Sequence, residues 1–225
     1  MCGRYYRRSD GRRIAETFGV VCPPSFDISP SYNIAPQTFQ PVVRLSEDTF
    51  ERKLVLMRWG FIPHWARDAR IGHDTINAKC EKVTTGAMFR DAIRYGRCLI
   101  PADGFFQWQE NAGKVKQPFA ISLKDGSLFA FAGLWERWTD KTTNRPQDTY
   151  AILTTEPNDL IASIHDRMPA ILAAKDYERW MAPADPAHLP VDLLRPYPAE
   201  EMITWKIDVR VGDVTNDEAT LIGPR

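Results

Sequence analysis

The sequence predicts an α+β fold, with a mostly antiparallel sheet or an open β-barrel as its core and helices at the periphery. Segments with strand character outnumber helical segments, and the two kinds do not alternate in the regular order of a parallel βαβ protein. No internal repeat, low-complexity tract or Gly/Ser-rich linker divides the 225 residues. We therefore expect a single domain over residues 1–225.

The expected strands are segments rich in β-branched and aromatic residues that lie between turn signals. In chain order they are residues 39–45, 53–59, 98–101, 105–109, 118–123, 128–135, 150–154, 168–172 and 203–207. The tripeptide Lys124-Asp125-Gly126 separates two of these segments and has the composition of a hairpin turn.

The first expected helix covers residues 9–18. Asp10 can cap its amino end, and Gly19 follows its last apolar residue, as a C-terminal capping residue does. A short helix is expected over residues 176–181, and Pro183 stops it.

The segment at 85–95 has a helical pattern as well. Helical spacing puts Met88, Ala92 and Tyr95 on one face of this helix. Gly96 follows as the expected C-terminal cap.

Positive and negative side chains balance. Lysine and arginine total 29 residues, as do aspartate and glutamate, so the formal net charge is zero. This balance argues against a protein covered in basic charge for non-specific nucleic-acid binding, although it is compatible with a local basic groove. Arginines concentrate near the amino end, where they form either a solvated helix face or a phosphate contact: Arg4, Arg7, Arg8, Arg12 and Arg13.

The sequence carries no sign of export or of a metal site. Residues 1–20 lack the continuous apolar region of a signal peptide, and no apolar run is long enough to span a bilayer. The four histidines are scattered, and the cysteines form no CxxC pair and no zinc-finger spacing: Cys2, Cys22, Cys80 and Cys98. We expect free thiols, no structural metal, no membrane contact and a cytoplasmic location.

The chain begins Met1-Cys2. If an aminopeptidase removes Met1, Cys2 presents a free α-amine beside a thiol. The amine can attack an aldehyde to give an imine, and the thiol can close on that imine to form a five-membered thiazolidine. Ordinary pKa values of about 7.7–8.0 for the amine and about 8.5 for the thiol predict that both are partly nucleophilic near neutral pH. The plainer alternative is that Cys2 simply follows the initiator methionine.

Two polar clusters in the first half of the chain lie in apolar or loop surroundings. In the run YNIAP, Asn33 can cap a loop through its side-chain amide. In the run INAKCE, alternation would put Asn77, Lys79 and Glu81 on one side of a strand. Such a face is either a solvated edge or the wall of a site, and the pattern alone favours neither.

Two further clusters follow in the second half. Asp103-Gly104 is a turn signal ahead of an aromatic strand in which Gln107 is the polar position, and the aromatic residues are either core or a base-stacking platform. His165 lies in a short polar run, SIHDRMP, that enters an apolar strand. Histidine titrates near neutral pH, so His165 is either structural or a proton-transfer group.

Together these segments resemble one family. The motifs MCGR, YNIAP, RWGFIPHW, INAKCE, GRCLIPADGFFQW, SIHDRMP and VGDVTND occur in the order found in the SRAP (SOS-response-associated peptidase) family, whose members recognise abasic sites in single-stranded DNA. The resemblance implies that Cys2, once Met1 is removed by self-processing or an aminopeptidase, forms a thiazolidine with the ring-opened abasic sugar. It also implies that Asn77 holds the sugar, that His165 transfers protons, and that Gln107 is the fourth catalytic position.

The same resemblance implies a set of DNA-contacting residues: Arg4, Asn33, Pro36, Trp65, Lys79, Thr154 and Arg167. Trp65 would be an aromatic wedge beside the lesion. Lys79 stands where relatives often have arginine, which keeps the charge but loses the bidentate fork. The expected partner is single-stranded DNA with an abasic site, and no metal or nucleotide cofactor is implied. The protein is expected to be a monomer. It is expected to associate with the nucleoid when DNA is damaged.

Two positions depart from the family pattern. Gln107 stands where relatives usually have glutamate, and an amide cannot exchange a proton with the opening sugar, so slower cross-linking is expected. Gly86-Ala87 stands where relatives tend to have Ser-Arg, so one phosphate contact is expected to be missing, with weaker and less salt-dependent DNA binding.

Two other functions remain open from the sequence. One is a thiol peptidase in which Cys2 attacks a peptide carbonyl. The other is a non-covalent single-stranded DNA-binding module in which Gln107 marks lost chemistry.

Overall fold

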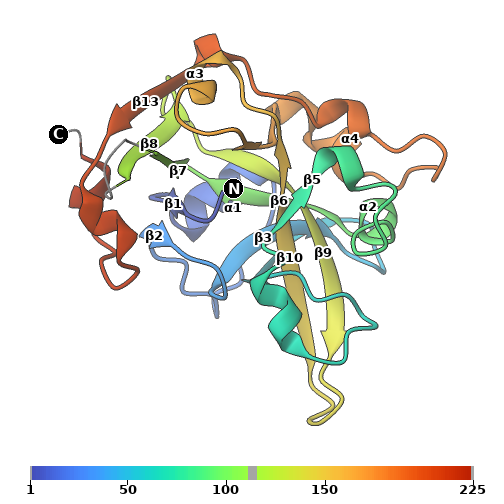
Figure 1. Ribbon diagram of the computed structural model, residues 1–225. Helices are drawn as coiled ribbons and strands as arrows, with labels where there is room; N and C mark the ends of the chain where they lie inside the picture. The colour runs from blue at the N-terminus through green and yellow to red at the C-terminus, as the bar shows by residue number, and fades with distance from the viewer. Residues whose placement is uncertain (1, 111–115, 224–225) are drawn as a thin grey trace.

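The computed structural model of the protein describes residues 2–110 and 116–223. Its strands form two sheets, and its short helices lie around them (Figure 1). Most strand pairs are antiparallel. Among the described residues, the parallel pairs are those of β10 with β4 and with β5. The predicted α+β class is confirmed.

The larger sheet closes on itself. Its strands are β3 (Phe39–Leu45), β4 (Arg52–Trp59), β5 (Asn77–Lys79), β6 (Arg97–Ala102), β9 (Phe129–Thr139), β10 (Pro146–Thr155), β11 (Met168–Pro169) and β12 (Ile171–Leu172). The order β10-β4-β3-β6-β9 becomes a ring because β9 also pairs with β10. The core is therefore a closed barrel, with β5, β11 and β12 added at its margin.

The smaller sheet is antiparallel throughout, in the order β13-β8-β7-β1-β2. Its strands are β1 (Tyr5–Arg7), β2 (Ser31–Ile34), β7 (Gly104–Gln109), β8 (Gln117–Leu123) and β13 (Met202–Lys206). The first residues of the chain thus form an inner strand, with partners on both sides.

Alternate barrel residues face two different apolar clusters, as the two-residue period of a strand requires. Val43 and Leu99 pack with the residues of the surrounding helices. Val42 and Ile100 pack instead with residues of the smaller sheet, such as Tyr5. The second cluster joins the two sheets, and it includes Cys2.

The helices are short and are spread along the chain. The α-helices are α1 (Gly11–Phe18), α2 (Ala92–Tyr95), α3 (Asp159–Ala162) and α4 (Tyr177–Met181). The 3-10 helices are η1 (Ala69–His73), η2 (Cys80–Lys82), η3 (Ala174–Asp176), η4 (Val191–Leu193), η5 (Ala199–Glu201), η6 (Val209–Gly212) and η7 (Ala219–Ile222). No helix in the described ranges is long and apolar enough to cross a membrane.

Most predicted strands are confirmed to within one residue at each end, namely those at 39–45, 53–59, 98–101, 105–109, 118–123 and 203–207. β9 and β10 are longer than expected and form a hairpin that projects from the barrel (Figure 1). The extension has few apolar residues, so its pattern did not predict strands. A bidentate ion pair links the two strands there: Arg137 Nε and Nη2 donate to the two carboxylate oxygens of Asp148, at 2.7 and 2.9 Å.

The predicted helix caps at the start of the chain are confirmed. The Asp10 side chain accepts a hydrogen bond from the backbone N–H of Arg13 at 2.9 Å, and Gly19 ends α1 with a left-handed φ of 63°. The helix begins at Gly11 rather than at Ser9. The short helix expected at 176–181 is confirmed as α4, which follows η3 directly.

The arginines near the amino end do not form one helix face, because β1 lies among them. Arg7 is a strand residue with 3% of its surface exposed. It donates hydrogen bonds to the carbonyl oxygens of Ser9 and Ser29, at 2.6 and 3.1 Å. Only Arg12 and Arg13 belong to α1. Neither β1 nor β2 was predicted, since both are short and rich in polar residues.

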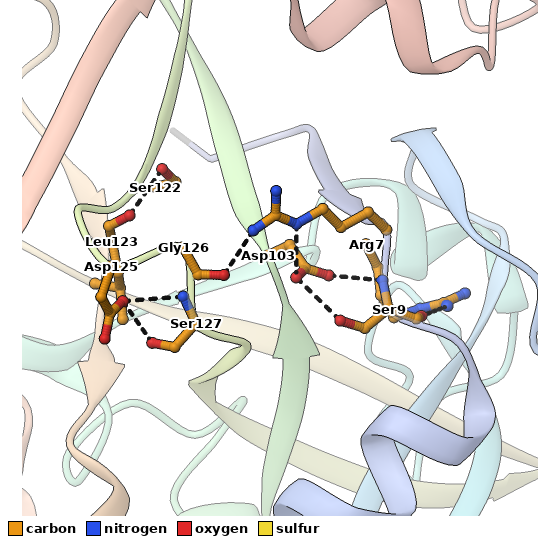
Figure 2. Close-up of polar contacts among 9 residues, drawn as sticks. Arg7, Ser9, Asp103, Ser122, Leu123, Asp125, Gly126 and Ser127 are labelled. Carbon is orange, nitrogen blue, oxygen red and sulfur yellow. Dashed lines mark hydrogen bonds and ion pairs between the residues drawn. The ribbon is translucent and has the colours of Figure 1, made fainter.

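The turn at Lys124-Asp125-Gly126 is not a hairpin turn. β8 before it pairs with β7 and β13, whereas β9 after it belongs to the barrel. Asp125 accepts two hydrogen bonds from Ser127 (Figure 2), and Gly126 has a left-handed φ of 67°. The prediction was wrong because turn residues set a change of direction but not which sheet the next strand joins.

The chain also changes sheet at Asp103-Gly104, between β6 and β7. The Asp103 carboxylate is buried and accepts hydrogen bonds from the backbone N–H and the hydroxyl of Ser9, at 2.9 and 3.0 Å (Figure 2). A Cβ atom on Gly104 would lie 2.3 Å from the Tyr6 ring. Only glycine, which has no Cβ atom, leaves room for the Tyr6 ring at this position.

The helix expected at 85–95 is mostly wrong. Only Ala92–Tyr95 is helical, and turns precede it. Tyr95 is 78% exposed, so the expected face is not a buried face. Gly96 is the C-terminal cap of this helix, as predicted, but it has a φ of −120° rather than a left-handed value. Its small size is needed for a different reason, because a Cβ there would lie 2.1 Å from the carbonyl oxygen of Trp135.

The strand expected at 168–172 is two strands. β11 pairs with β10, and β12 pairs with β9. Ala170 separates them, donating to the carbonyl of Leu153 and accepting from the N–H of Ala132, both at 2.8 Å. The single apolar run thus connects to two barrel strands in turn.

Candidate active site

A cavity of about 770 Å³ lies between the end of β7 and the loop after α3. Two of the predicted catalytic residues, Gln107 and His165, line it. Glu110 and Lys116 supply opposite charges at its border and form an ion pair of 2.6 Å. Sequence segments nearly sixty residues apart therefore meet at one site.

The His165 imidazole has a defined hydrogen-bonding state. Its Nδ1 atom accepts a hydrogen bond from the backbone N–H of Arg167 at 2.9 Å. The neutral ring then carries its proton on Nε2. Burial, followed by the positive charge of the amino terminus, lowers the pKa of His165 below its ordinary value. Near neutral pH, the ring is therefore neutral and can donate through Nε2.

Gln107 is almost fully buried, with 1% of its surface exposed. Its Nε2 atom donates a hydrogen bond to the carbonyl oxygen of Arg167 at 3.0 Å. This bond uses one of the two N–H donors of the amide, which leaves the second N–H as a donor and the oxygen as an acceptor. The residue can orient a donor group by hydrogen bonding, but it cannot exchange a proton.

Asn77 occupies β5, which runs parallel to β10 at the barrel margin. The side chain is 9% exposed, and its Nδ2 atom lies 3.5 Å from the carbonyl oxygen of Ile152. The Oδ1 atom is buried and has no hydrogen-bond partner among the described residues. A buried acceptor without a donor costs about 1–3 kcal/mol, so a hydroxyl group bound at this atom would relieve that cost.

Lys79 and Glu81 do not share the surroundings of Asn77, although alternation suggested that they would. The strand ends at Lys79, and η2 begins with the next residue. Lys79 is exposed at the rim, and Glu81 lies on the 3-10 helix with an exposed side chain. The short strand therefore has a buried amide at one end and a solvated cation at the other.

Cys2 is fully buried in the cluster that joins the two sheets. The N–H of Phe106 donates to the carbonyl oxygen of Arg4 at 3.0 Å, so the β1–β7 pairing continues toward Cys2. The next residues on β7 are those of the cavity wall. The same cluster contains Ile161, whose carbonyl oxygen accepts the N–H of His165 at 2.9 Å. The structure thus brings Cys2 into the same region as Gln107 and His165.

Burial raises the pKa of the Cys2 thiol to about 12. The folded protein therefore keeps this thiol protonated near neutral pH. The expectation of a partly ionised thiol, made for the chain without Met1, used the value of a solvated cysteine and did not include this burial.

Arg4 and Asn33 are joined to a loop near the carboxyl end. Arg4 donates to Asn33 Oδ1 at 2.7 Å and to the carbonyl oxygen of Val211 at 2.8 Å. Asn33 Nδ2 lies within hydrogen-bond distance of the carbonyl oxygens of Val211, Asp213 and Asn216, at 3.2, 3.0 and 2.7 Å. In the described chain both residues therefore hold the motif VGDVTND, and Asn33 is 4% exposed.

Arg167 and Thr154 lie at the other side of the site. The Arg167 guanidinium forms a bidentate pair with Glu81, at 2.7 and 3.1 Å, and donates to the carbonyl oxygen of Thr154. The Thr154 side chain is itself fully buried. Sequence reasoning missed this role of Glu81. The residue stood in the polar run INAKCE, but a partner so distant in sequence left no local signal.

The remaining predicted DNA contacts lie farther away. Trp65 is 49% exposed. Its loop packs at the opposite end of β10, where Ile62 N–H donates to Thr149 Oγ1 and Ala66 accepts from Trp138 Nε1, both at 2.8 Å. Thr149 and Thr154 are five residues apart, which corresponds to about 17 Å of strand. The structure does not bring Trp65 to His165, and Pro36 lies in the turn after β2.

Comparison with known proteins adds sequence relatives and a solved structure. The family model described as SOS response associated peptidase (SRAP) matches residues 1–214. A protein of Bacillus subtilis (strain 168) named "Abasic site processing protein YoqW" is 40% identical over 225 residues, which cover 99% of each chain. A second protein of that organism, "Abasic site processing protein YoaM", is 39% identical and covers 99% of this chain and 97% of its own. A crystal structure of a protein from Bacteroides thetaiotaomicron matches with a TM-score of 0.88 at 27% identity, over 100% of both chains.

Proposed function

This chain belongs to the SOS response associated peptidase family, and from that membership we propose that it recognises abasic sites in single-stranded DNA and captures them covalently through Cys2. The relatives named abasic site processing proteins support the substrate. The chemistry is supported by the packing of Cys2 in one cluster with Phe105 and Ile161, which lie on the two segments that carry Gln107 and His165. The reactive form is the protein from which Met1 has been removed.

The proposed reaction starts with opening of the abasic sugar, which is mostly a closed hemiacetal. Ring opening moves one proton from the anomeric hydroxyl to the ring oxygen. His165 Nε2–H gives its proton to the ring oxygen as the C–O bond breaks, and Nε2 takes the proton of the anomeric hydroxyl in exchange, so the imidazole ends neutral. The Cys2 amine then adds to the aldehyde and water leaves, which forms a C=N bond. The thiol adds across this bond, so that a C–S bond forms and the thiol proton passes to nitrogen. The product is a thiazolidine, and no oxidant, reductant or metal takes part.

The observation that carries the proposal is the buried Oδ1 atom of Asn77. A native protein rarely leaves such an acceptor without a donor, so its state suggests that a ligand supplies one. A hydroxyl group of the opened sugar has the required donor and the required size. Asn77 thus holds the sugar while the Cys2 amine attacks it.

The charge at the border of the site suits a nucleic acid. Lys79 is exposed beside Asn77, and Lys116 lies on the cavity wall near His165. Lysine side chains attract backbone phosphates without reading sequence, as recognition of a missing base requires. Single-stranded DNA also exposes the lesion without any cost of base flipping.

The first prediction concerns the covalent adduct. Processed protein mixed with a single-stranded oligonucleotide that contains one abasic site should give a slower band on a denaturing gel. Cys2→Ala should give no adduct, because it removes the thiol that closes the ring, while its native binding to the same oligonucleotide should stay within about twofold.

Cys22→Ala is the matched control, because this second free cysteine lies away from the site and its loss should leave the adduct intact. Intact mass establishes that Met1 is absent. An adduct formed by Cys2→Ala would move the nucleophile elsewhere. Native binding without an adduct in the wild type would favour the non-covalent module, and turnover of a peptide without any DNA effect would favour the peptidase.

A further inference from the structure

The Arg167 side chain is fixed from two directions. Glu81, from η2, holds the guanidinium by two hydrogen bonds, and the backbone carbonyl of Thr154, from β10, accepts a third. The Arg167 side chain is 13% exposed. A bidentate arginine–carboxylate pair sets both the position and the plane of the guanidinium. Three elements that are distant in the sequence therefore converge on one side chain.

The backbone of the same residue holds two residues of the candidate site. Its N–H donates to His165 Nδ1 at 2.9 Å, and its carbonyl oxygen accepts from Gln107 Nε2 at 3.0 Å. A shift of the backbone at residue 167 would therefore disturb the hydrogen bonds of both His165 and Gln107. The loop that carries His165 is otherwise short, with β11 beginning one residue after Arg167.

We infer that Arg167 is a positioning residue, and that the Glu81–Arg167 pair fixes the backbone of residue 167 so that His165 keeps its proton on Nε2 and the Gln107 amide keeps its orientation. This inference rests on the proposed function for its consequence in catalysis. The positioning itself is a property of the protein without DNA.

The immediate neighbour of His165 makes this positioning necessary. The Asp166 carboxylate lies 3.0 Å from the same Nδ1 atom. Nδ1 cannot both accept from the Arg167 N–H and donate to Asp166. A released residue 167 would let Asp166 draw the proton to Nδ1, which moves the donor away from Nε2. The Glu81–Arg167 pair therefore selects between two tautomers of one imidazole.

The principal alternative is that Arg167 contacts a DNA phosphate directly. Both of its terminal nitrogens already have partners, and its Nε atom is buried without a partner among the described residues. A phosphate would have to displace Glu81. In that case, removal of Glu81 would strengthen DNA binding, whereas loss of a positioning contact would leave the affinity unchanged.

Nitrogen-15 spectra of the histidine rings in the DNA-free protein test the positioning. The His165 signals are identified by their loss in His165→Gln. In the wild type, Nδ1 should be unprotonated and Nε2 protonated at pH 7.5. Glu81→Ala should move His165 toward a mixture of tautomers, and Glu81→Gln should restore part of the wild-type pattern because it can still accept from Arg167. Asp192→Ala is the matched control, since it removes the carboxylate of a second bidentate arginine pair, with Arg179, on another part of the chain.

The cross-linking assay tests the consequence. With saturating abasic DNA, Glu81→Ala should slow adduct formation by roughly tenfold or more, as a misplaced catalytic group does, and native affinity should stay within about twofold. Unchanged ring spectra in Glu81→Ala would overturn the positioning role, as would a gain in affinity with an unchanged rate. A shifted His165 tautomer in a protein that forms no adduct even as wild type would uphold the positioning and reject the proposed function.

Discussion

Cys2 brings two nucleophiles to the proposed reaction, and burial acts on them differently. The raised pKa of its thiol keeps the sulfur protonated in the folded protein. The first bond is made by the amine, however, and the sulfur attacks only after the imine has formed beside it. The pH dependence of capture should therefore follow the amine and His165 rather than the ionisation of the thiol.

This protection can be measured by alkylation. Near pH 8, iodoacetamide should modify Cys2 on the order of a thousandfold more slowly in the folded protein than in urea, because each unit by which the pKa rises removes a factor of about ten in thiolate. Mass spectrometry of the peptide that contains Cys2 gives both rates. Similar rates in the two states would show that the thiol is accessible and ionisable when folded.

The amide at Gln107 leads to a prediction about a carboxyl group at the same position. Gln107→Glu should accelerate adduct formation by about a hundredfold, the lower end of the range of roughly 10²–10⁴ that general acid–base groups typically supply. The new carboxyl would face the Arg167 carbonyl oxygen in a buried position, and both features raise its pKa and favour the protonated form. Equal rates for the two proteins, measured by quenched gel assays, would show that the carboxyl is dispensable.

The sign of the stability change in this variant follows from the raised pKa. The folded state prefers the protonated carboxyl, so Gln107→Glu should be most stable below the ordinary glutamate pKa of about 4.3. Its stability should then fall relative to the wild type as the pH rises toward the folded-state pKa. Urea unfolding at two pH values, compared with the wild type, measures this difference.

At the scale of elements, the position of the site depends on the two segments in which the chain crosses from one sheet to the other. The chain leaves the barrel at Asp103-Gly104 and returns to it after Gly126. β7 carries Gln107 into the smaller sheet beside β1, the strand that follows Cys2. A change at the first passage should therefore act on the site through the pairing of β7 and β1.

Gly104→Ala tests this passage. The added Cβ would lie 2.3 Å from the Tyr6 ring and 2.4 Å from the carbonyl oxygen of Ile121, and the backbone atom cannot move aside cheaply. We expect a loss of at least about 2 kcal/mol in the free energy of unfolding. Gly212→Ala is the control, because its added Cβ meets nothing within 4 Å. Equal urea midpoints for the two variants would contradict the requirement for glycine.

Sequence patterns predicted the elements whose apolar residues repeat with a clear period. β3, β4, β6 and β8 are such strands, and α1 has capping residues at both ends. β1 and β2 could not be found this way because they are too short to show a period, and the far halves of β9 and β10 because they have few apolar residues. The expected hairpin after β8 failed because strand partners depend on contacts far along the chain.

The candidate site was predictable in part. Gln107 and His165 do line one cavity, whereas Asn77 is a buried polar group on β5 that is not among the residues lining it. Those residues were predicted from the motifs of the family and not from the periodicity of apolar residues. The environment could not be read from the sequence, since the burial of Cys2 and the pairing of Glu81 with Arg167 depend on the closed barrel.

For the whole molecule, the buried thiols determine the response to alkaline pH. Burial raises the pKa values of Cys2, Cys80 and Cys98. Below about pH 8.5 the thiols are protonated in both states, and the stability is fully present. Above that pH the unfolded thiols ionise while the folded ones do not, so stability is lost until the folded pKa values are reached.

Each such thiol should lower the free energy of unfolding by about 1.4 kcal/mol per pH unit above pH 8.5. Urea unfolding at pH 8, 9 and 10 measures this slope. Cys98→Ala should reduce the slope by the contribution of one thiol, whatever its effect on stability at pH 8. A slope that is the same in wild type and variant would show that Cys98 ionises equally in both states.

The attachment of Arg4 and Asn33 to residues 211–216 has a consequence for synthesis of the protein. Those contacts can form only after residues 211–216 have been synthesised, so the amino end lacks them while the residues before 211 are being made. An aminopeptidase that removes Met1 would act in this interval, before the thiol of the proposed nucleophile is enclosed.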